Sequence, residues 1–289
     1  MRNEQQIFDL ILNFAKQEER IRIVMLEGSR TNRCIPKDDF QDYDIKFLVT
    51  DMDWFQKSDQ WLNQFGTIIM MQKPEAMELF PPDPKGFFSY IMLFDDGVKI
   101  DLTLLPVERL EEYLTWDKLM QVLLDKDHRI SYDIVPTDED YHVKKPTAGE
   151  YDDCCNEFWN VTSYIVKGLC RNEILFAVDH MNQILRPELL RMLSWKVGIK
   201  TGFSLSVGKN YKFLPKYLSK ELWERLLSTY QMNGYSQMWN ALFTCHQLFR
   251  EVSKEVGEEL RYPYPPYDKG VTWYTKKQYE QYGSVGYEQ

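Results

Sequence analysis

The sequence predicts an α+β fold, with a mixed β-sheet flanked by helices in the N-terminal half and a bundle of α-helices in the C-terminal half. Short β-branched and apolar runs between turn residues occupy most of residues 21–105, which is typical of strands. Beyond residue 150, apolar residues recur at spacings of three and four, which is typical of helices. A polar segment punctuated by prolines, residues 129–150, separates the two patterns. We therefore predict two domains, residues 1–135 and 136–289.

The composition is that of a globular protein. Of the 289 residues, 44% are hydrophobic and 27% are charged, which excludes a largely disordered chain. No apolar run approaches the ~20 residues needed to cross a bilayer, and the N-terminus is too polar to be a secretory leader. We therefore expect a cytoplasmic protein with no membrane partner, and we favour a monomer.

Cysteine content and net charge restrict the function further. The five cysteines are odd in number and form neither a disulfide framework nor a zinc-binding pattern, so inert thiols are expected. A net charge of -9 argues against a nucleic-acid partner, which would need a basic surface. A negative cleft would attract a cationic ligand. The alternative, favoured on charge alone, is that the acidity only keeps the protein soluble.

The elements of the first half follow from periodicity and turn residues. Residues 4–19 place apolar side chains on one helical face, whereas residues 54–65 alternate charge with aromatics and predict a surface helix. Asp95-Asp96-Gly97 suits the tight turn of a hairpin. Prolines impose a loop at residues 80–84, and a helix begins at Pro106 and runs through Tyr113. The predicted strands are residues 21–26, 43–50, 67–72, 87–94 and 98–105.

The second half is predicted to be helical up to its tail. Apolar residues at spacings of three and four indicate a bundle, with helices at residues 155–169, 172–198, 220–227 and 235–256. The tail segment Y-P-Y-P-P-Y-D-K-G, residues 262–270, is too rich in proline for a helix. We assign no role to residues 263–289.

Two aspartates open the strand at residues 43–50, and their spacing places them on one face. Residues i and i+2 of a strand point the same way, about 7 Å apart, so Asp42 and Asp44 are neighbours. Two carboxylates without a cation repel each other and raise each other's pKa. Mg²⁺ removes that penalty, because it binds a few carboxylates together with water and phosphate oxygens. The alternative is a solvated strand edge.

A third carboxylate, Asp101, lies inside the apolar run of residues 98–105, where an uncompensated charge is costly to bury. If this strand pairs with residues 43–50, Asp101 joins Asp42 and Asp44. Three carboxylates can hold two metal ions about 3.5–4 Å apart. Such a pair stabilises the attacking and leaving oxygens in phosphoryl or nucleotidyl transfer.

Gly28-Ser29 could supply the anion-binding side of such a site. The pair follows the strand at residues 21–26 and opens a turn, where backbone N–H groups and the Ser29 hydroxyl can meet phosphate oxygens. Glycine permits this close approach because it has no Cβ. The alternative is an ordinary turn. Gly-Ser, twelve residues, Asp-Tyr-Asp-Ile and a later Ile-Asp-Leu together form a far more specific pattern than any one of them.

This pattern resembles the signature of the nucleotidyltransferase superfamily that includes DNA polymerase beta. Over nearly the whole chain, up to about Tyr267, the sequence resembles the aminoglycoside 6-adenylyltransferases, which are bacterial streptomycin-modifying enzymes. The segments that carry this resemblance include E-G-S-R-x-N, F-Q-D-Y-D-I, K-I-D-L-T-L-L-P, E-Y-D-D-C-C-N-E-F-W-N-V and S-V-G-K-N-Y-K. One departure is Gln41, which precedes Asp42 where many members of the superfamily have serine.

The resemblance implies transfer of AMP from ATP to a hydroxyl of streptomycin, the 6-OH of its streptidine ring, with release of pyrophosphate. It further implies that Asp42, Asp44 and Asp101 bind Mg²⁺. Asp101 would also take the proton from the attacking hydroxyl, and the sequence leaves its roles as base and metal ligand unseparated. Ser29 with Gly28 would hold the β- and γ-phosphates. Arg30 would screen the charge of the leaving group.

The resemblance also implies that basic residues of the helical domain reach the triphosphate. Lys209 and Lys212 of S-V-G-K-N-Y-K are candidates, and Lys196 of L-S-W-K-V-G is another. Lys209 is the best match among them. The alternative is that all three are solvated surface lysines.

For the drug, E-Y-D-D-C-C-N-E-F-W-N concentrates acids and an aromatic at the start of the predicted bundle. A guanidinium pairs with carboxylates and stacks on aromatic faces, which makes Asp153, Glu157 and Trp159 candidates, with Asp179 as a further one. The alternative is an acidic helix N-terminus favoured by the helix dipole, with Trp159 in the core. Two other functions stay open: a nucleotidyltransferase for another aminoglycoside, protein or RNA, and a binding module without catalysis.

Overall fold

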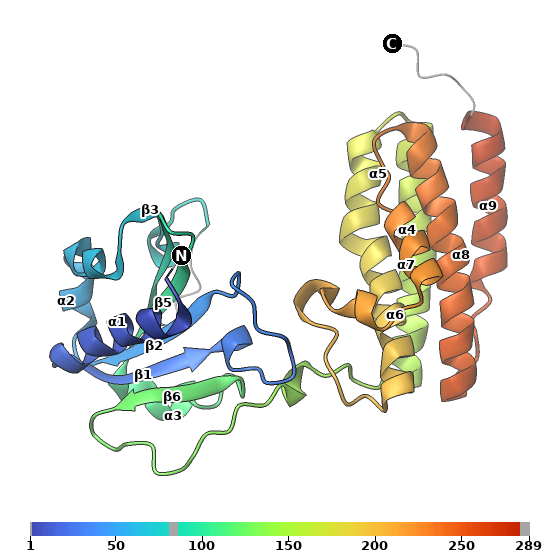
Figure 1. Cartoon of the computed structure of the whole chain (residues 1–289). Coiled ribbons are helices and arrows are strands. Elements are labelled where there is room, and N and C mark those ends of the chain that lie inside the picture. Colours follow the sequence, from blue (N-terminus) through green and yellow to red (C-terminus); the bar gives the residue numbers. More distant parts are fainter. Residues whose placement is uncertain (1, 81–85, 284–289) are drawn as a thin grey trace. The chain divides into compact units, whose positions relative to one another are not determined.

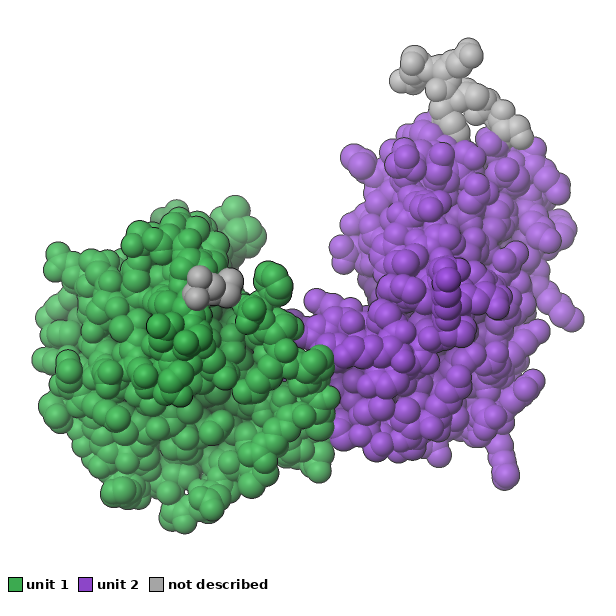
Figure 2. All heavy atoms as spheres, viewed as in Figure 1, with its two compact units in different colours: residues 1–140 green, residues 141–289 purple. Residues whose placement is uncertain are grey.

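The computed structural model describes residues 2–80 and 86–283. Most of the predicted loop at residues 80–84 lies outside these residues. The chain divides into two compact units, residues 1–140 and 141–289, which Figure 2 distinguishes by colour. The division falls inside the polar segment 129–150, five residues beyond the boundary suggested by the sequence.

Within the described residues, unit 1 contains a six-stranded mixed sheet of order β3-β4-β5-β2-β1-β6 (Figure 1). Only β2 and β5 pair in parallel; the other neighbours are antiparallel. The predicted hairpin is β4 and β5, turned at Gly97 with φ +82°. The strands are β1 Ile21–Glu27, β2 Tyr43–Val49, β3 Ile68–Gln72, β4 Phe88–Phe94, β5 Lys99–Pro106 and β6 Met120–Asp125.

The two faces of this sheet differ in what covers them. Helix α1, Glu4–Gln17, lies across one face (Figure 1) and packs Ile7 and Ile11 against alternate strand residues such as Ile45. On the opposite face a smaller apolar cluster joins Met25 to the short helix α3, Leu110–Tyr113. The three predicted aspartates belong to this second face, because side chains alternate along a strand. The smaller cluster leaves room for polar groups there.

Two expectations for unit 1 were wrong or incomplete. The predicted surface helix at residues 54–65 is instead a short helix, α2 Met52–Gln56, followed by a 3₁₀ helix, Asp59–Phe65. Its aromatic residues face inward, since Phe55 and Phe65 are fully buried. Strand β6 was not predicted at all, although it completes the sheet beside β1.

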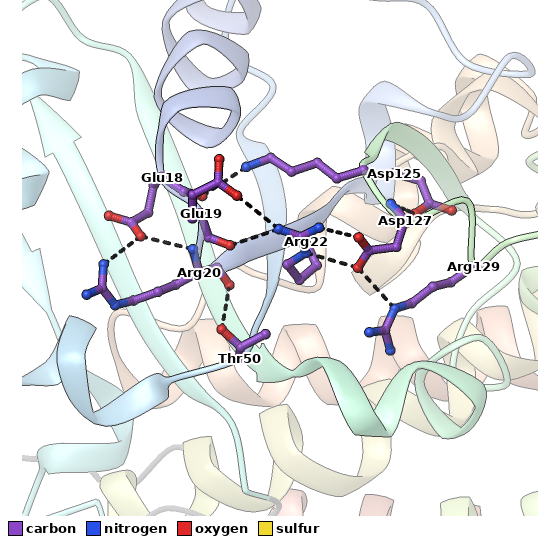
Figure 3. Close-up of polar contacts among 9 residues, drawn as sticks. Glu18, Glu19, Arg20, Arg22, Thr50, Asp125, Asp127 and Arg129 are labelled. Atoms are coloured by element: carbon purple, nitrogen blue, oxygen red, sulfur yellow. Dashed lines mark hydrogen bonds and ion pairs between the residues drawn. The ribbon is translucent and has the colours of Figure 1, made fainter.

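Ion pairs link the segment just after β6 to the start of β1. Figure 3 shows Arg22 of β1 donating to Asp127, just beyond β6, at 2.9 Å, and to Glu19 at 3.2 Å. Arg129 also donates to Asp127, at 3.3 Å. The hydrogen bonds to Arg22 hold the pKa of Asp127 down at about 2. These contacts lie at the opposite end of β1 from Gly28.

Unit 2 is a bundle of helices around one apolar core, as predicted. Thr147 and Glu150 form a capping box that starts α4. Helices α5 and α6 run on through a π-helical segment, Met181–Leu185. The helices are α4 Ala148–Cys170, α5 Ile174–His180, α6 Arg186–Thr201, α7 Lys220–Ser228, α8 Tyr235–Leu260 and α9 Tyr267–Tyr282.

The tail corrects the sequence-based expectation. Helix α9 begins at Tyr267, directly after Pro266, so Tyr267 to Gly270 are helical although the proline content argued against it. Asp268 in its first turn is buried, and it accepts a 2.6 Å hydrogen bond from Arg250 of α8. The prolines therefore end before the helix, and this ion pair fixes its start. In the part of the chain that the structure describes, no helix is both long and apolar enough to span a bilayer.

Candidate active site

Strand pairing brings the three aspartates to one edge of the sheet. β2 and β5 pair in parallel, as the sequence-based argument required, and Asp44 is the direct partner of Asp101. Asp42 directly precedes the first residue of β2 and lies two residues before Asp44. Asp42 and Asp101 both lie within 2.8 Å of one nitrogen, Nζ of Lys99. The carboxylates therefore form one cluster.

Lys99 is a member of this cluster that sequence reasoning did not single out. Its ammonium donates to Asp42 Oδ2 at 2.7 Å and to Asp101 Oδ2 at 2.8 Å. Burial lowers the pKa of Lys99, but its hydrogen bonds to Asp101 and Asp42 outweigh this and raise the pKa above its ordinary value. The signal was present in the sequence, because Lys99 is two residues from Asp101 and shares its face.

The surroundings of Asp44 raise the pKa of its carboxyl group. Burial raises its pKa to about 6, and the charges of Asp101, Asp42 and Glu27 act in the same direction, while Lys46 opposes them. A carboxylate in this state gains from any additional cation. The charge distribution around Asp44 is therefore suited to a cationic ligand.

The donor set fits Mg²⁺ by its chemistry, since all three groups offer hard carboxylate oxygens. Oδ1 of Asp101 is buried and accepts no hydrogen bond within the described residues, although Lys99 Nζ lies 2.8 Å from it outside hydrogen-bond geometry. Among the same residues, no group of three or more His, Cys, Asp or Glu side chains is arranged to hold a metal ion. In this arrangement Lys99 provides the positive charge.

The glycine of the Gly28-Ser29 turn is required by the site. The turn is a 3₁₀ helix, Gly28–Arg30, directly after β1, and Gly28 has φ +70°. A Cβ on Gly28 would lie 2.4 Å from Oδ2 of Asp44, so any larger residue would displace that carboxylate. The Ser29 hydroxyl has no hydrogen-bond partner among the residues described. The turn thus lies against the acidic cluster with one polar group available.

Arg30 does not have the position expected of a group that screens a leaving phosphate. Only 7% of its side chain is exposed. The guanidinium donates to the backbone oxygens of Gln41 at 2.6 Å and Asp42 at 3.1 Å, and it stacks 3.6 Å over the ring of Tyr43. An ion pair with Glu4 at 3.2 Å completes its contacts. Arg30 therefore fixes the chain that carries Asp42.

Gln41, the residue that departs from the superfamily pattern, has a related contact. Its amide Nε2 donates to the backbone oxygen of Ser29 at 3.3 Å. The hydrogen bond joins the loop before β2 to the Gly28–Arg30 turn after β1. Gln41 and Arg30 together hold the loop that carries Asp42 against the Gly28–Arg30 turn.

The predicted lysines belong to unit 2 and differ in their surroundings. Lys196 is paired with Glu255 of α8. Lys209, in the 3₁₀ turn Lys209–Tyr211 that follows α6, and Lys212, directly after that turn, are both exposed. Lys212 Nζ lies 5.1 Å from the ring centre of Phe213. Gly208, with φ +78°, directs the chain into this turn. Lys209 and Lys212 are therefore accessible to a ligand, whereas Lys196 is already in an ion pair.

The residues predicted to contact the drug also differ in their surroundings. Asp153 and Glu157 line a hollow of about 270 Å³ on the surface of unit 2, formed by α4 and α6, whose other lining residues are Glu150, Cys154, Glu188, Arg191 and Trp195. Trp159 is 1% exposed and packs on Phe249 in the bundle core. The core alternative is therefore the one observed for Trp159. Asp179 is exposed on α5 and does not line this hollow.

Comparison with known proteins gives a consistent result. Residues 1–278 match the family described as streptomycin adenylyltransferase. An aminoglycoside 6-adenylyltransferase of Campylobacter jejuni is 61% identical over 98% of both chains, and one of Bacillus subtilis (strain 168) is 59% identical over 96% of this chain and 98% of the relative. A crystal structure of an aminoglycoside 6-adenyltransferase from Bacillus subtilis is 53% identical, covers 96% of this chain and 99% of the other, and has a TM-score of 0.49.

Proposed function

Since this chain belongs to the streptomycin adenylyltransferase family of nucleotidyltransferase enzymes, we propose that it transfers AMP from ATP to the 6-OH of streptomycin and releases pyrophosphate. The observation that carries the proposal is the register of β2 and β5, which pairs Asp44 with Asp101. The close approach of Gly28 to Asp44 supports it, because the Gly28–Arg30 turn, to which we assign phosphate binding, then lies beside the carboxylates.

Asp101 is the base of the proposed reaction. The hydroxyl oxygen of the drug bonds to the α-phosphorus, the bond to the pyrophosphate oxygen breaks, and the hydroxyl proton passes to a carboxylate oxygen of Asp101. The Asp101 side chain is 27% exposed, so a bound hydroxyl can reach its carboxylate. Ser29 and the backbone at Gly28 hold the phosphates, while Arg30 and Gln41 keep Asp42 in place.

Asp42, Asp44 and Asp101 are the residues we propose to hold Mg²⁺. When bound, the ion would supply charge neutralisation and polarisation of the reacting oxygens. The raised pKa of Asp44 supports this assignment, because a cation bound beside the carboxylate would offset the cost of its ionisation. The ion pairs of Lys99 with Asp42 and Asp101 would be rearranged on binding.

For the remaining ligand contacts we propose Asp153 and Glu157 for the cationic drug and Lys209 and Lys212 for the triphosphate. Asp153 and Glu157 share an acidic hollow, which suits a guanidinium. Lys196 is the less suitable lysine, since Glu255 already neutralises it.

The proposal is tested by mass spectrometry of the drug. Purified protein with ATP, Mg²⁺ and streptomycin should add one AMP to the drug, and NMR should place it on the 6-OH. Asp101→Asn should lower turnover at least about a hundredfold, because the base is lost. Asp95→Asn is the matched control, since Asp95 is exposed in the β4–β5 turn. Unmodified drug, or labelled protein or RNA in a lysate given labelled ATP, would contradict the proposal.

A further inference from the structure

Asn32 is a buried polar residue close to the Gly28–Arg30 turn to which no role has been assigned. It closes the E-G-S-R-x-N segment, two residues beyond the turn, and 9% of it is exposed. A buried amide needs hydrogen-bond partners within the protein, because its contact with water is lost. The partners of Asn32 therefore show what the side chain holds together.

Two hydrogen bonds link Asn32 to its neighbours in the chain. Its backbone N–H donates to the Ser29 oxygen at 3.3 Å, and its Oδ1 accepts the backbone N–H of Cys34 at 2.8 Å. Only the oxygen end of an amide accepts a hydrogen bond, so the Cys34 contact fixes which end of the side chain is Oδ1. The Nδ2 end is left to donate elsewhere.

This Nδ2 donates to a carboxylate at the other end of unit 1. It lies 3.3 Å from Oδ2 of Asp138. Within residues 131–140, all of which the structure describes, Asp138 is the buried residue, with 8% of it exposed. Burying a carboxylate is costly unless hydrogen bonds compensate. The contact is therefore a buried link between the Gly28–Arg30 turn and the last residues of unit 1.

The segment that carries Asp138 is itself attached to the sheet. Thr137 N–H donates to the Lys118 oxygen at 3.1 Å, and Lys118 Nζ donates to Asp140 at 3.0 Å. Lys118 lies two residues before β6, which pairs with β1. Asp138 is therefore a fixed point, and a hydrogen bond to it can orient the side chain that donates.

What Asn32 orients in turn is Ser29. The backbone oxygen of Ser29 accepts the N–H of Asn32 at 3.3 Å and Nε2 of Gln41 at 3.3 Å. A rotation of this peptide group would break both hydrogen bonds. The orientation of Ser29, whose hydroxyl we assign to the phosphates, thus depends on Gln41 on one side and on Asn32 on the other.

We propose that Asn32 is a positioning residue for the phosphate-binding turn, which it orients through its hydrogen bond to Asp138. The inference rests on the proposed function and deepens it, because it adds Asn32 and Asp138 to the residues on which phosphate binding depends. In this role Asn32 acts through Ser29 and not on the reacting atoms.

The test compares steady-state kinetics of full-length variants. Asn32→Asp keeps the acceptor for Cys34 but sets a second carboxylate against Asp138, and the two repel each other. The KM for ATP and the inhibition constant of pyrophosphate should both rise about tenfold, because both ligands use the turn. The KM for streptomycin should stay within about twofold. Asn63→Asp is the matched control, since Asn63 is exposed in the 3₁₀ helix Asp59–Phe65, and it should behave as the wild type.

A double variant tests the link itself. Asn32→Asp combined with Asp138→Asn restores one donor and one acceptor in reversed order, so it should recover most of the affinity for ATP. A variant that is merely less stable would have a smaller active fraction, which lowers the apparent kcat and leaves the KM for ATP unchanged. The recovery and the rise in KM therefore separate positioning from stability.

A second single variant covers the case in which melting curves show that Asn32→Asp fails to fold. Asn32→Ser can still bond the N–H two residues further on, but a serine side chain is too short to reach Asp138. Its KM for ATP should also rise. An unchanged KM for ATP in Asn32→Ser, or a double variant without recovery, would overturn the inference.

Failure of the proposed function is distinguishable from failure of this inference. If the proposed function fails, the wild-type protein leaves streptomycin unmodified, and calorimetric affinities for ATP with Mg²⁺ then replace KM in the same comparison. If the inference alone fails, wild-type turnover is intact and the Asn32 variants bind ATP as the wild type does.

Discussion

Arg30 is the last residue of the Gly28–Arg30 turn, and its guanidinium is bound by other groups of the protein itself. It holds two backbone oxygens in the loop before β2 and stacks on Tyr43. Lysine could not replace these contacts, because an ammonium lacks the planar fork that reaches two carbonyls and the flat face that stacks. The place of Asp42 therefore depends on Arg30 as well as on Gln41.

We predict that Arg30→Lys lowers kcat about tenfold or more, because misplacing a catalytic group by about an ångström is costly. Initial rates with saturating ATP and streptomycin measure the effect. Arg20→Lys is the control: Arg20 also stacks on a ring, that of Trp54 at 4.3 Å, but at the other end of β1. Equal losses of kcat in the two variants, or none in Arg30→Lys, would contradict the positioning role.

Ionisation of the buried Asp44 carboxyl group lowers the stability of the folded protein. Its folded-state pKa of about 6 lies above the ordinary value of 3.8, mainly because of burial. Between these values the folded state binds more protons than the unfolded state, so the free energy of unfolding falls as pH rises through 6. The stabilising effect of protonation is fully present only below about pH 3.8.

Asp44→Asn should therefore increase the free energy of unfolding in metal-free protein at pH 7.5, by up to about 3 kcal/mol. Near pH 4 the difference should disappear, since asparagine does not titrate and Asp44 is then protonated. Urea unfolding in EDTA at the two pH values measures this, with Asp95→Asn as the control. Mg²⁺ should reduce the difference. If Asp44→Asn were less stable than the wild type at pH 7.5, the ionised carboxylate of Asp44 would not be destabilising.

At the scale of elements, local sequence patterns were sufficient to predict helices and strands that bury one face. The β4–β5 hairpin and the helices α1, α4 and α8 follow from alternation, from turn residues and from apolar spacing. The sequence analysis could only assume that β2 pairs with β5. Two strands that are far apart in the chain carry no local sequence signal of their pairing. That pairing nevertheless decides where Asp101 lies.

The elements that were missed depend on contacts distant in sequence. β6 has an alternating burial too weak to stand out, and it exists because it pairs with β1 and is fastened by Arg22 and Asp127. The start of α9 depends on the ion pair of Asp268 with Arg250. For the site, the carboxylates and the glycine turn were visible in the sequence. The engagement of Arg30 needed the structure, because its partners lie in α1 and in the loop before β2, away from Arg30 in the chain.

At the scale of the whole molecule, the buried apolar clusters among the described residues each draw on one unit alone. Two clusters on the two sheet faces serve residues 1–140, and one cluster along the bundle serves residues 141–289. Both units have the length of ordinary independent domains. A core that needs no residue from the other unit should form without it.

We therefore predict that residues 1–140 and 141–289, expressed separately, each fold with a cooperative thermal transition. Circular dichroism should show mixed α and β content in the first fragment and mainly helix in the second. A fragment of residues 1–118 is the control for the boundary, because it lacks β6 and with it Met120 of the smaller sheet-face cluster. Its exposed β1 edge should leave it aggregated or without a cooperative transition. Cooperative folding of residues 1–118, or failure of residues 1–140, would show that β6 does not complete the first unit.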